Sequence, residues 1–277
     1  MTIEKILQRV RDVVRLRIAF QTMKDFWKQS VIITLLFSAM FAMFAGMYPS
    51  FVDMLEEMQE SGSWEQFMFL PGIEDMASYI GFLNMEMYQI FWMLILGLIL
   101  GFLAASVISA EIESKTIDIL MSNPVSKAQI VVEKFLGLLP MVLMINFVTM
   151  GILILVTIGI GETVNFSYLF LTHVLSLPYF FGIIALGILI SVIINEKMKA
   201  SIITMAILIG MFIFNSIANM IPDYGALGLV SLQRYFKPYD TLKLGQIDAT
   251  ANIVLLLFCI VCIIAAMIYF HHKDIIL

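Results

Sequence analysis

The sequence has few charged residues and very few cysteines. Charged residues make up 13% of its 277 residues, apolar residues make up 61%, and the mean hydropathy is +0.98. This composition excludes an ordinary soluble domain. The two cysteines, Cys259 and Cys262, are one helical turn apart among Leu, Phe, Val and Ile. Free cysteines in such surroundings behave as small apolar residues, so we expect neither a disulfide framework nor a redox pair.

Motifs for catalysis and cofactor binding are also missing. The sequence contains no G-x-x-x-x-G-K-[ST] phosphate loop, no zinc-protease motif and no G-x-S-x-G. A chain without a phosphate loop cannot bind and hydrolyse ATP by that route. We therefore expect no catalytic residues, no metal site and no cofactor in this chain, which is not an enzyme by itself. We expect no nucleic-acid partner either.

Six long apolar runs are present instead. Crossing a bilayer takes roughly 20 helical residues, and backbone groups in lipid must be satisfied within the segment. The sequence therefore predicts an all-α integral membrane protein, with residues 1–277 forming one transmembrane domain of six helices. The runs cover about 30–48, 88–109, 137–160, 169–194, 200–220 and 250–270.

Residues 1–28 form a basic amphipathic segment. At 100° per residue, apolar side chains of residues 3–20 gather on one side and charged ones on the other, with Arg17 as the exception. A helix of this kind lies at the lipid headgroup boundary. The segment is too charged for a signal peptide. It is either a plain surface anchor or a helix that also contacts a partner subunit.

The distribution of basic residues predicts the orientation. All of them except Arg234, Lys237 and Lys243 fall on one side of the predicted spans, whereas the loop 49–87 carries acidic residues and no Lys or Arg. Short basic loops stay in the cytoplasm. We therefore expect a multi-pass protein of the cell membrane with both termini cytoplasmic, and with 49–87 as an extracytoplasmic loop.

One polar island, residues 110–134, interrupts the apolar sequence and reads AEIESKTIDILMSNPVSKAQIVVEK. Pro124 disfavours helix at Asn123, so we expect a short helix from Ile112 to Ser122. Ser126 followed by Gln129 fits a capping box that begins the third span. The pattern resembles the cytoplasmic coupling segment of type-2 ABC exporter permeases, E-x-E-x-G-T followed by an apolar pair and P-V-S-R. Lys115 stands where that family has glycine.

The resemblance implies a permease subunit of an ABC transporter that exports a substrate. Its partners would be separate ABC ATPase subunits, which hold ATP and Mg, and a second permease that is identical or homologous. The family often has short re-entrant helices before its last span, which 221–249 would supply. The residues expected to couple to the ATPase are Glu111, Glu113, Thr116, Ile119, Leu120 and Pro124.

Other features inside the spans leave alternatives open. Gly97, Gly101, Ala105 and Ser109 recur every four residues, and such a ladder packs closely against a helix of the same chain or of a second permease. His173 is an ionisable residue inside a span and a candidate for a transport role. A neutral, hydrogen-bonded histidine is the favoured interpretation.

Two other classes of protein compete with the permease. An ion-gradient-driven secondary transporter should show repeated halves, interrupted helices and paired buried charges. No convincing repeat and almost no buried charge is found. The remaining alternative is a membrane scaffold that transports nothing.

Overall fold

The described part of the protein is an all-α bundle, and six of its helices are long and apolar enough to cross a membrane. The computed structural model describes residues 16–62, 71–117, 122 and 125–273, and within these ranges it contains helices and no strand. Each of the six predicted spans is helical, which confirms the fold class. The spans are α3 (Trp27–Ser61), the joined α4 (Tyr79–Phe82), η3 (Leu83–Leu96) and α5 (Gly97–Glu113), then α7 (Lys127–Gly159), α8 (Phe166–Ile193), α9 (Lys197–Met220) and α11 (Ala249–His272).

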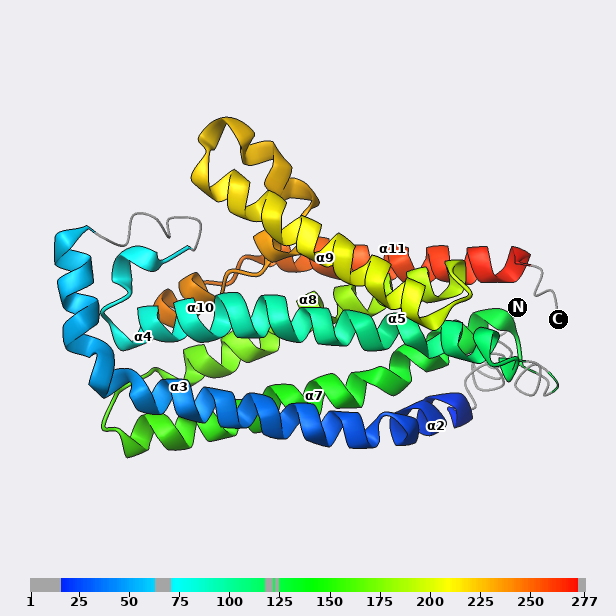
Figure 1. Ribbon diagram of the computed structural model, residues 1–277, viewed down its shortest axis with the longest axis horizontal. Coiled ribbons are helices and arrows are strands. Elements are labelled where there is room, and N and C mark those ends of the chain that lie inside the picture. Colours follow the sequence, from blue (N-terminus) through cyan, green and yellow to red (C-terminus); the bar gives the residue numbers. More distant parts are fainter. Residues whose placement is uncertain (1–15, 63–70, 118–121, 123–124, 274–277) are drawn as a thin grey trace, which may run out of the picture.

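The first span is longer than a bilayer requires. Its 35 residues would extend about 50 Å as an ideal helix, against roughly 30 Å of hydrocarbon. The helix bends sharply near its far end, and Pro49 lies in its interior (Figure 1). A proline removes one backbone donor and bends a helix without always ending it. The segment expected to be a loop from residue 49 therefore begins as helix, up to Ser61.

The fourth span, α8, lies at the centre of the bundle. It packs against α5, α7 and α11. In its most apolar stretch of 18 residues, 67% is buried inside the protein. In the corresponding apolar stretches of α9 and α11 only 22% and 28% is buried, so these two helices expose most of their apolar surface. The second span is unusual because η3 is a π-helix of 14 residues.

The small-residue ladder of α5 packs inside this chain. A methyl group added at Gly101 would lie 2.6 Å from Leu208 Cδ1, and one added at Gly97 would lie 3.0 Å from Ile183 Cδ1. All four ladder residues are buried, Ala105 and Ser109 completely. The ladder therefore serves packing against α8 and α9. A seam between two permeases at these residues, the other alternative, is withdrawn because α8 and α9 occupy that face.

Shorter elements complete the described chain. At the N-terminal side, α2 (Arg17–Asp25) packs against α7, and residues 1–15 of the predicted interface helix lie outside the described residues. The segment 221–249 holds η4 (Pro222–Val230), η5 (Leu232–Tyr235) and α10 (Pro238–Leu244), while η2 (Ile73–Asp75) precedes α4. Figure 1 shows α9 leaning away from the bundle toward η4, which packs beside it.

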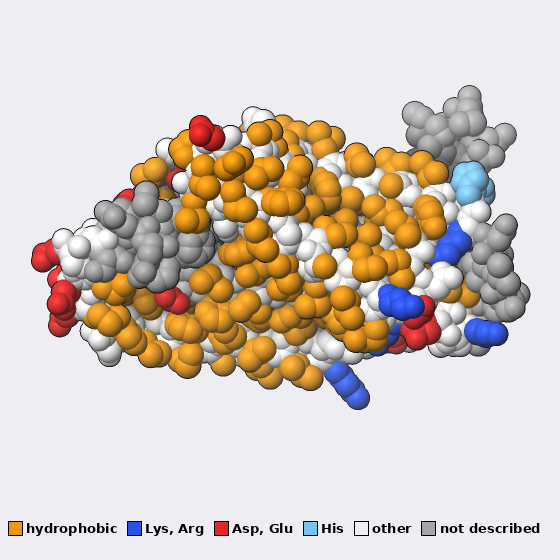
Figure 2. Space-filling view, turned by 45° about the horizontal axis from the view of Figure 1, so that its top comes forward, with side chains coloured by type: hydrophobic (Ala, Val, Ile, Leu, Met, Phe, Trp, Pro, Cys, Tyr) orange, Lys and Arg blue, Asp and Glu red, His pale blue; other side chains and the backbone are white. Residues whose placement is uncertain are grey.

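Charges separate toward the two ends of the bundle. We call the end that carries the start of α2 and the end of α11 the basic end, and the opposite one the acidic end. In the view of Figure 2 the Lys and Arg side chains gather at the first end, beside some Asp and Glu side chains, and the second end shows Asp and Glu side chains. The described acidic residues of 49–87 are Asp53, Glu56, Glu57, Glu60, Glu74, Asp75 and Glu86.

Candidate functional site: a charged network at the basic end

The polar island begins with a tight turn at the end of α5. Thr116 N–H donates to the carbonyl of Glu111 at 3.0 Å, and Lys115 N–H donates to the carbonyl of Ile112 at 3.1 Å. These are the two hydrogen bonds of a Schellman motif, whose C′ residue adopts a left-handed conformation and is usually glycine. Lys115 occupies that position with φ of 56°. The turn therefore forms although glycine is absent, at a conformational cost of about 1–2 kcal/mol.

This turn changes the expected boundaries of the island. The helix predicted from Ile112 to Ser122 does not begin there, because α5 continues to Glu113 and Lys115 then breaks the helical path. Residues 110–113 belong to α5 and 127–134 belong to α7, so the connection between them is 114–126. Of the predicted coupling residues, Ile119, Leu120 and Pro124 lie outside the described residues.

The described part of the connection is exposed on one side and anchored on the other. Ser114, Lys115 and Thr116 are exposed, whereas Ile117 is completely buried. The Thr116 hydroxyl lies 2.9 Å from the Ser114 hydroxyl. The described part of the connection is therefore an exposed polar turn followed by a buried apolar residue.

Glu111 ties α5 to α7. Its carboxylate forms an ion pair with Lys134, whose side chain is only 5% exposed. An ammonium this well shielded from water needs a partner, because leaving one charge of a buried pair alone costs several kcal/mol.

Glu113 ties α5 to α9. Its carboxylate accepts a hydrogen bond of 2.8 Å from Lys197 N–H, the first residue of α9. A carboxylate at a helix N-terminus satisfies a free donor and opposes the positive end of the helix dipole. The family-like spacing Glu-x-Glu thus supplies one link to α7 and one to α9.

A third carboxylate, Glu133, ties α7 to α2. Its Oε2 accepts hydrogen bonds from Ile18 N–H at 2.9 Å and Ala19 N–H at 3.3 Å, and its Oε1 accepts one from Gln129 Nε2 at 2.6 Å. The side chain is almost completely buried. It caps the N-terminus of α2, which has no side-chain cap of its own. The sequence prediction missed Glu133, because its contacts with α2 join residues far apart in the sequence.

Lysines close the network at the ends of α8 and α11. Lys273 Nζ donates to the carbonyl of Ile193 at 3.2 Å and to that of Val192, where α8 ends. Lys127 Nζ in turn donates to the carbonyl of Lys273 at 2.7 Å. Burial lowers the pKa of the Lys273 ammonium below its usual value. The carbonyls that a helix leaves unpaired at its C-terminus favour such cations.

The start of α7 agrees with the sequence prediction. The Ser126 hydroxyl accepts a hydrogen bond of 3.1 Å from Gln129 N–H, which confirms Ser126 as the cap of this helix. The reciprocal half of the capping box is absent from the described contacts, because the Gln129 side chain bonds to Glu133 instead. The cap therefore joins the network that holds α2.

His173 lies in a separate polar cluster in the core. Its Nε2 is 3.0 Å from the Tyr88 hydroxyl, its Nδ1 is 2.8 Å from Asn146 Oδ1, and the ring is completely buried. The Asn146 amide nitrogen donates to the His173 carbonyl and to the Ser176 hydroxyl. Both ring nitrogens thus have partners, as a neutral imidazole that joins α7, α8 and η3 requires. Its contacts give it a structural role.

Comparison with known proteins agrees with this architecture. Residues 21–275 match the family described as ABC-2 family transporter protein. This chain belongs to the ABC-2 transporter family. The match extends from α2 to the end of α11 and so covers all six spans. A search of curated proteins finds no match.

Membership identifies the chain as the permease subunit of an ABC transporter, a multi-pass membrane protein that is not itself catalytic. ABC transporters draw their energy from ATPase subunits, so the family implies such partners for this ABC-2 permease. The expectation from the island's motif is confirmed at the level of the family.

Proposed function

We propose that this ABC-2 permease exports a substrate and that an ATPase subunit docks on the connection 114–126 at the basic, cytoplasmic end. The observation that supports it is the network directly beneath the exposed turn. Glu111, Glu113 and Glu133 link α5 to α7, α5 to α9 and α7 to α2. A push on this turn is therefore distributed over several helices at once.

Rigid links of this kind suit a lever. Movement of an ATPase on binding ATP would displace the turn, and the connected helix ends would move as one body, as alternating access requires. The energy comes from contacts that differ between two states of the complex. Most basic residues lie at this end, with Arg234, Lys237 and Lys243 as the exceptions, and this bias supports a cytoplasmic location.

We further propose that two permeases meet on the face formed by α3, α5 and α9. An apolar groove of about 490 Å³ lies between these helices, lined among others by Ile33, Ile99 and Met205. In the most apolar 18-residue stretches of α9 and α3, only 22% and 39% is buried in the single chain. Shape-complementary packing is the main attraction between helices in lipid, so a groove is a better seam than a flat face.

An ion-gradient mechanism finds less support in the described residues. In three of their four ion pairs both side chains are at least partly exposed, and the pairs lie near the ends of the spans or in the segments that connect the spans. The buried His173 has two neutral hydrogen-bond partners. A proton or ion relay would need ionisable groups along the spans.

The test is copurification from native membranes of the chain with an ATPase that contains a phosphate loop. Replacing Ile119 and Leu120 by Asp should remove the ATPase and uncouple its hydrolysis from transport. Replacing the exposed Thr116 by Ser, which keeps the hydroxyl, is the matched control and should change neither. Unchanged copurification and coupling in the double variant would contradict docking at this connection.

A further inference from the structure

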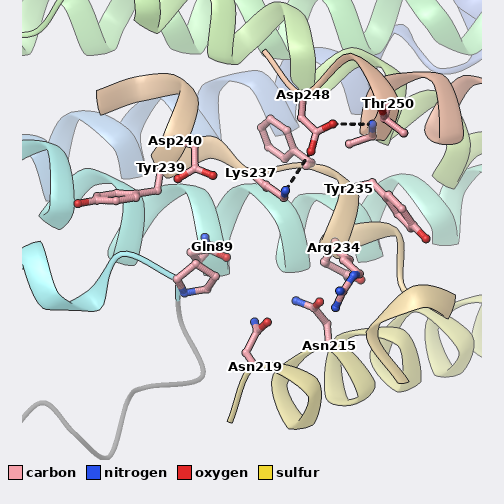
Figure 3. Close-up of a pocket in the computed structure, with 14 residues that line it drawn as sticks. Gln89, Asn215, Asn219, Arg234, Tyr235, Lys237, Tyr239, Asp240, Asp248 and Thr250 are labelled. Atoms are coloured by element: carbon pink, nitrogen blue, oxygen red, sulfur yellow. Dashed lines mark hydrogen bonds and ion pairs between the residues drawn. The ribbon is translucent and has the colours of Figure 1, made fainter. Parts of the chain in front are cut away.

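A polar cavity lies at the acidic end of the permease, far from the proposed ATPase site. It has a volume of about 500 Å³ and lies between α9, η3 and the segment that joins α9 to α11. A second cavity of about 410 Å³ shares Lys237, Asp240 and Asp248 with it. Binding sites for small molecules fall in the same range of size, roughly 300–1,000 Å³. Figure 3 shows polar side chains converging on this space from several elements.

Two of the charges in the lining neutralise each other. Lys237 Nζ lies 2.9 Å from Asp248 Oδ2, and Asp248 Oδ1 accepts a hydrogen bond from Ala251 N–H at the start of α11. That hydrogen bond, followed by Lys237, lowers the pKa of the Asp248 carboxyl below its usual range. Arg234 and Asp240 also line the cavity, and neither has an ionic partner among the described residues.

Arg234 is held in place by η4. Its Nη1 donates to the Gly225 carbonyl at 3.2 Å, and a methyl group added at Gly228 would lie 2.6 Å from the same Nη1. The guanidinium has five donors, and most of them stay available to a ligand. On α9, Asn215 contributes a buried Oδ1 with no hydrogen-bond partner in the described structure. Buried polar atoms without partners are uncommon, and a ligand is one way to satisfy them.

We propose that this cavity binds a zwitterionic group, with its anionic part on Arg234 and its cationic part toward Asp240. Figure 3 shows these two side chains on different sides of the cavity, with the Lys237–Asp248 pair between them. A purely anionic ligand would meet the acidic side chains of this end without compensation, and a purely cationic one would meet Arg234. The Asn215 oxygen would accept a hydrogen bond from the ligand.

The group can be part of a lipid or of a soluble molecule. Exposed apolar side chains cover the outer surfaces of α9 and η4 beside the cavity, among them Ile213, Met220 and Leu229. A zwitterionic lipid could place its headgroup in the cavity and its chains on this surface. A soluble zwitterion would use the charged lining alone. Both share the same recognition chemistry and differ in their dependence on the bilayer.

Titration calorimetry of the purified full chain in detergent tests the proposal, with glycerophosphoethanolamine as the zwitterionic probe. Glycerophosphoglycerol carries only the anionic phosphodiester and ethanolamine only the cationic ammonium, and each should bind at least about tenfold more weakly. Arg234→Gln and Asp240→Asn should each weaken binding of glycerophosphoethanolamine by at least about tenfold. Gly228→Ala should also weaken binding of the probe, because the added methyl group displaces the Arg234 guanidinium without changing its charge.

Asp223→Asn is the matched control, because Asp223 is an exposed carboxylate of η4 that lines neither cavity. It should bind the probe as the unmodified chain does. Equal binding of the zwitterion and the single-charge probes, or unchanged binding in the folded Arg234 and Asp240 variants, would overturn the proposal. These measurements need no ATPase, so they fail or succeed independently of the proposed coupling.

A comparison of two bilayers distinguishes the sources. In nanodiscs of phosphatidylethanolamine, a lipid ligand would compete and suppress probe binding, whereas nanodiscs of phosphatidylglycerol would leave it intact. Equal probe binding in both bilayers would assign the cavity to a soluble zwitterion.

Discussion

Removal of the Glu133 carboxylate should release α2 from the bundle. Glu133→Ala leaves Ile18 N–H and Ala19 N–H without the acceptor that they have in the intact chain. These donors lie at the start of α2, where no other side chain caps the helix. The link between α7 and α2 is one of the three links of the proposed lever, so the docking of α2 tests one part of it.

The expected loss follows from the two hydrogen bonds. A hydrogen bond to a charged acceptor contributes about 1.5–3 kcal/mol, and loss of a helix cap costs about 0.5–2 kcal/mol. The 3.3 Å bond is the weaker of the two. Together these effects give about 3 kcal/mol, which is roughly 150-fold in the opening equilibrium of α2. Glu133→Gln keeps a carbonyl acceptor and should lose about half as much, roughly tenfold.

Hydrogen exchange of residues 17–25, followed by mass spectrometry, measures this opening. Exchange should accelerate strongly in Glu133→Ala, moderately in Glu133→Gln, and not in Glu196→Ala. The last is the control, because the Glu196–Lys199 pair is exposed on both sides and such pairs contribute little. Unchanged protection of α2 in Glu133→Ala, with the rest of the bundle intact, would refute the capping role.

Three further predictions concern the turn, the docking of α2 and the orientation. Lys115→Gly should raise the free energy of unfolding by up to about 1 kcal/mol, whereas Lys115→Val should lower it, because β-branched residues tolerate a positive φ poorly. Equal melting temperatures of the two variants would contradict a strained turn. Gly137→Ala should cost about 1–3 kcal/mol, because its methyl would lie 2.7 Å from the backbone of α2, while Gly151→Ala, with open space, should not destabilise. In intact cells an impermeant thiol reagent should label Glu60→Cys but not Lys199→Cys. The two native cysteines are buried, so they should add little background labelling. The reverse labelling pattern would invert the topology.

Much of the fold could be predicted from the sequence because lipid imposes simple rules. Length and hydropathy sufficed for the six spans, and the Ser126 cap followed from local chemistry. The continuation of α3 past Pro49 could not be predicted, because a proline marks a helix end or a bend equally well. The turn at Lys115 was also missed, since sequence preference disfavours it and the surrounding hydrogen bonds decide it.

The candidate site was only partly predictable for a similar reason. Glu111 and Glu113 were named from a resemblance, and their partners Lys134 and Lys197 became evident only from the fold. Glu133 was missed because its partners are backbone donors more than a hundred residues away, which no local pattern shows. The cavity around Arg234 likewise combines residues from distant parts of the chain.

Photocrosslinking in native membranes tests the central claim most directly. A photoreactive amino acid would replace Thr116 at the basic end or Glu60 at the acidic end, both of which are exposed. We expect the Thr116 position to crosslink to a protein whose peptides contain a phosphate loop, and the Glu60 position not to. A phosphate-loop protein captured from Glu60 and not from Thr116 would contradict the assignment of the connection 114–126 as the docking site.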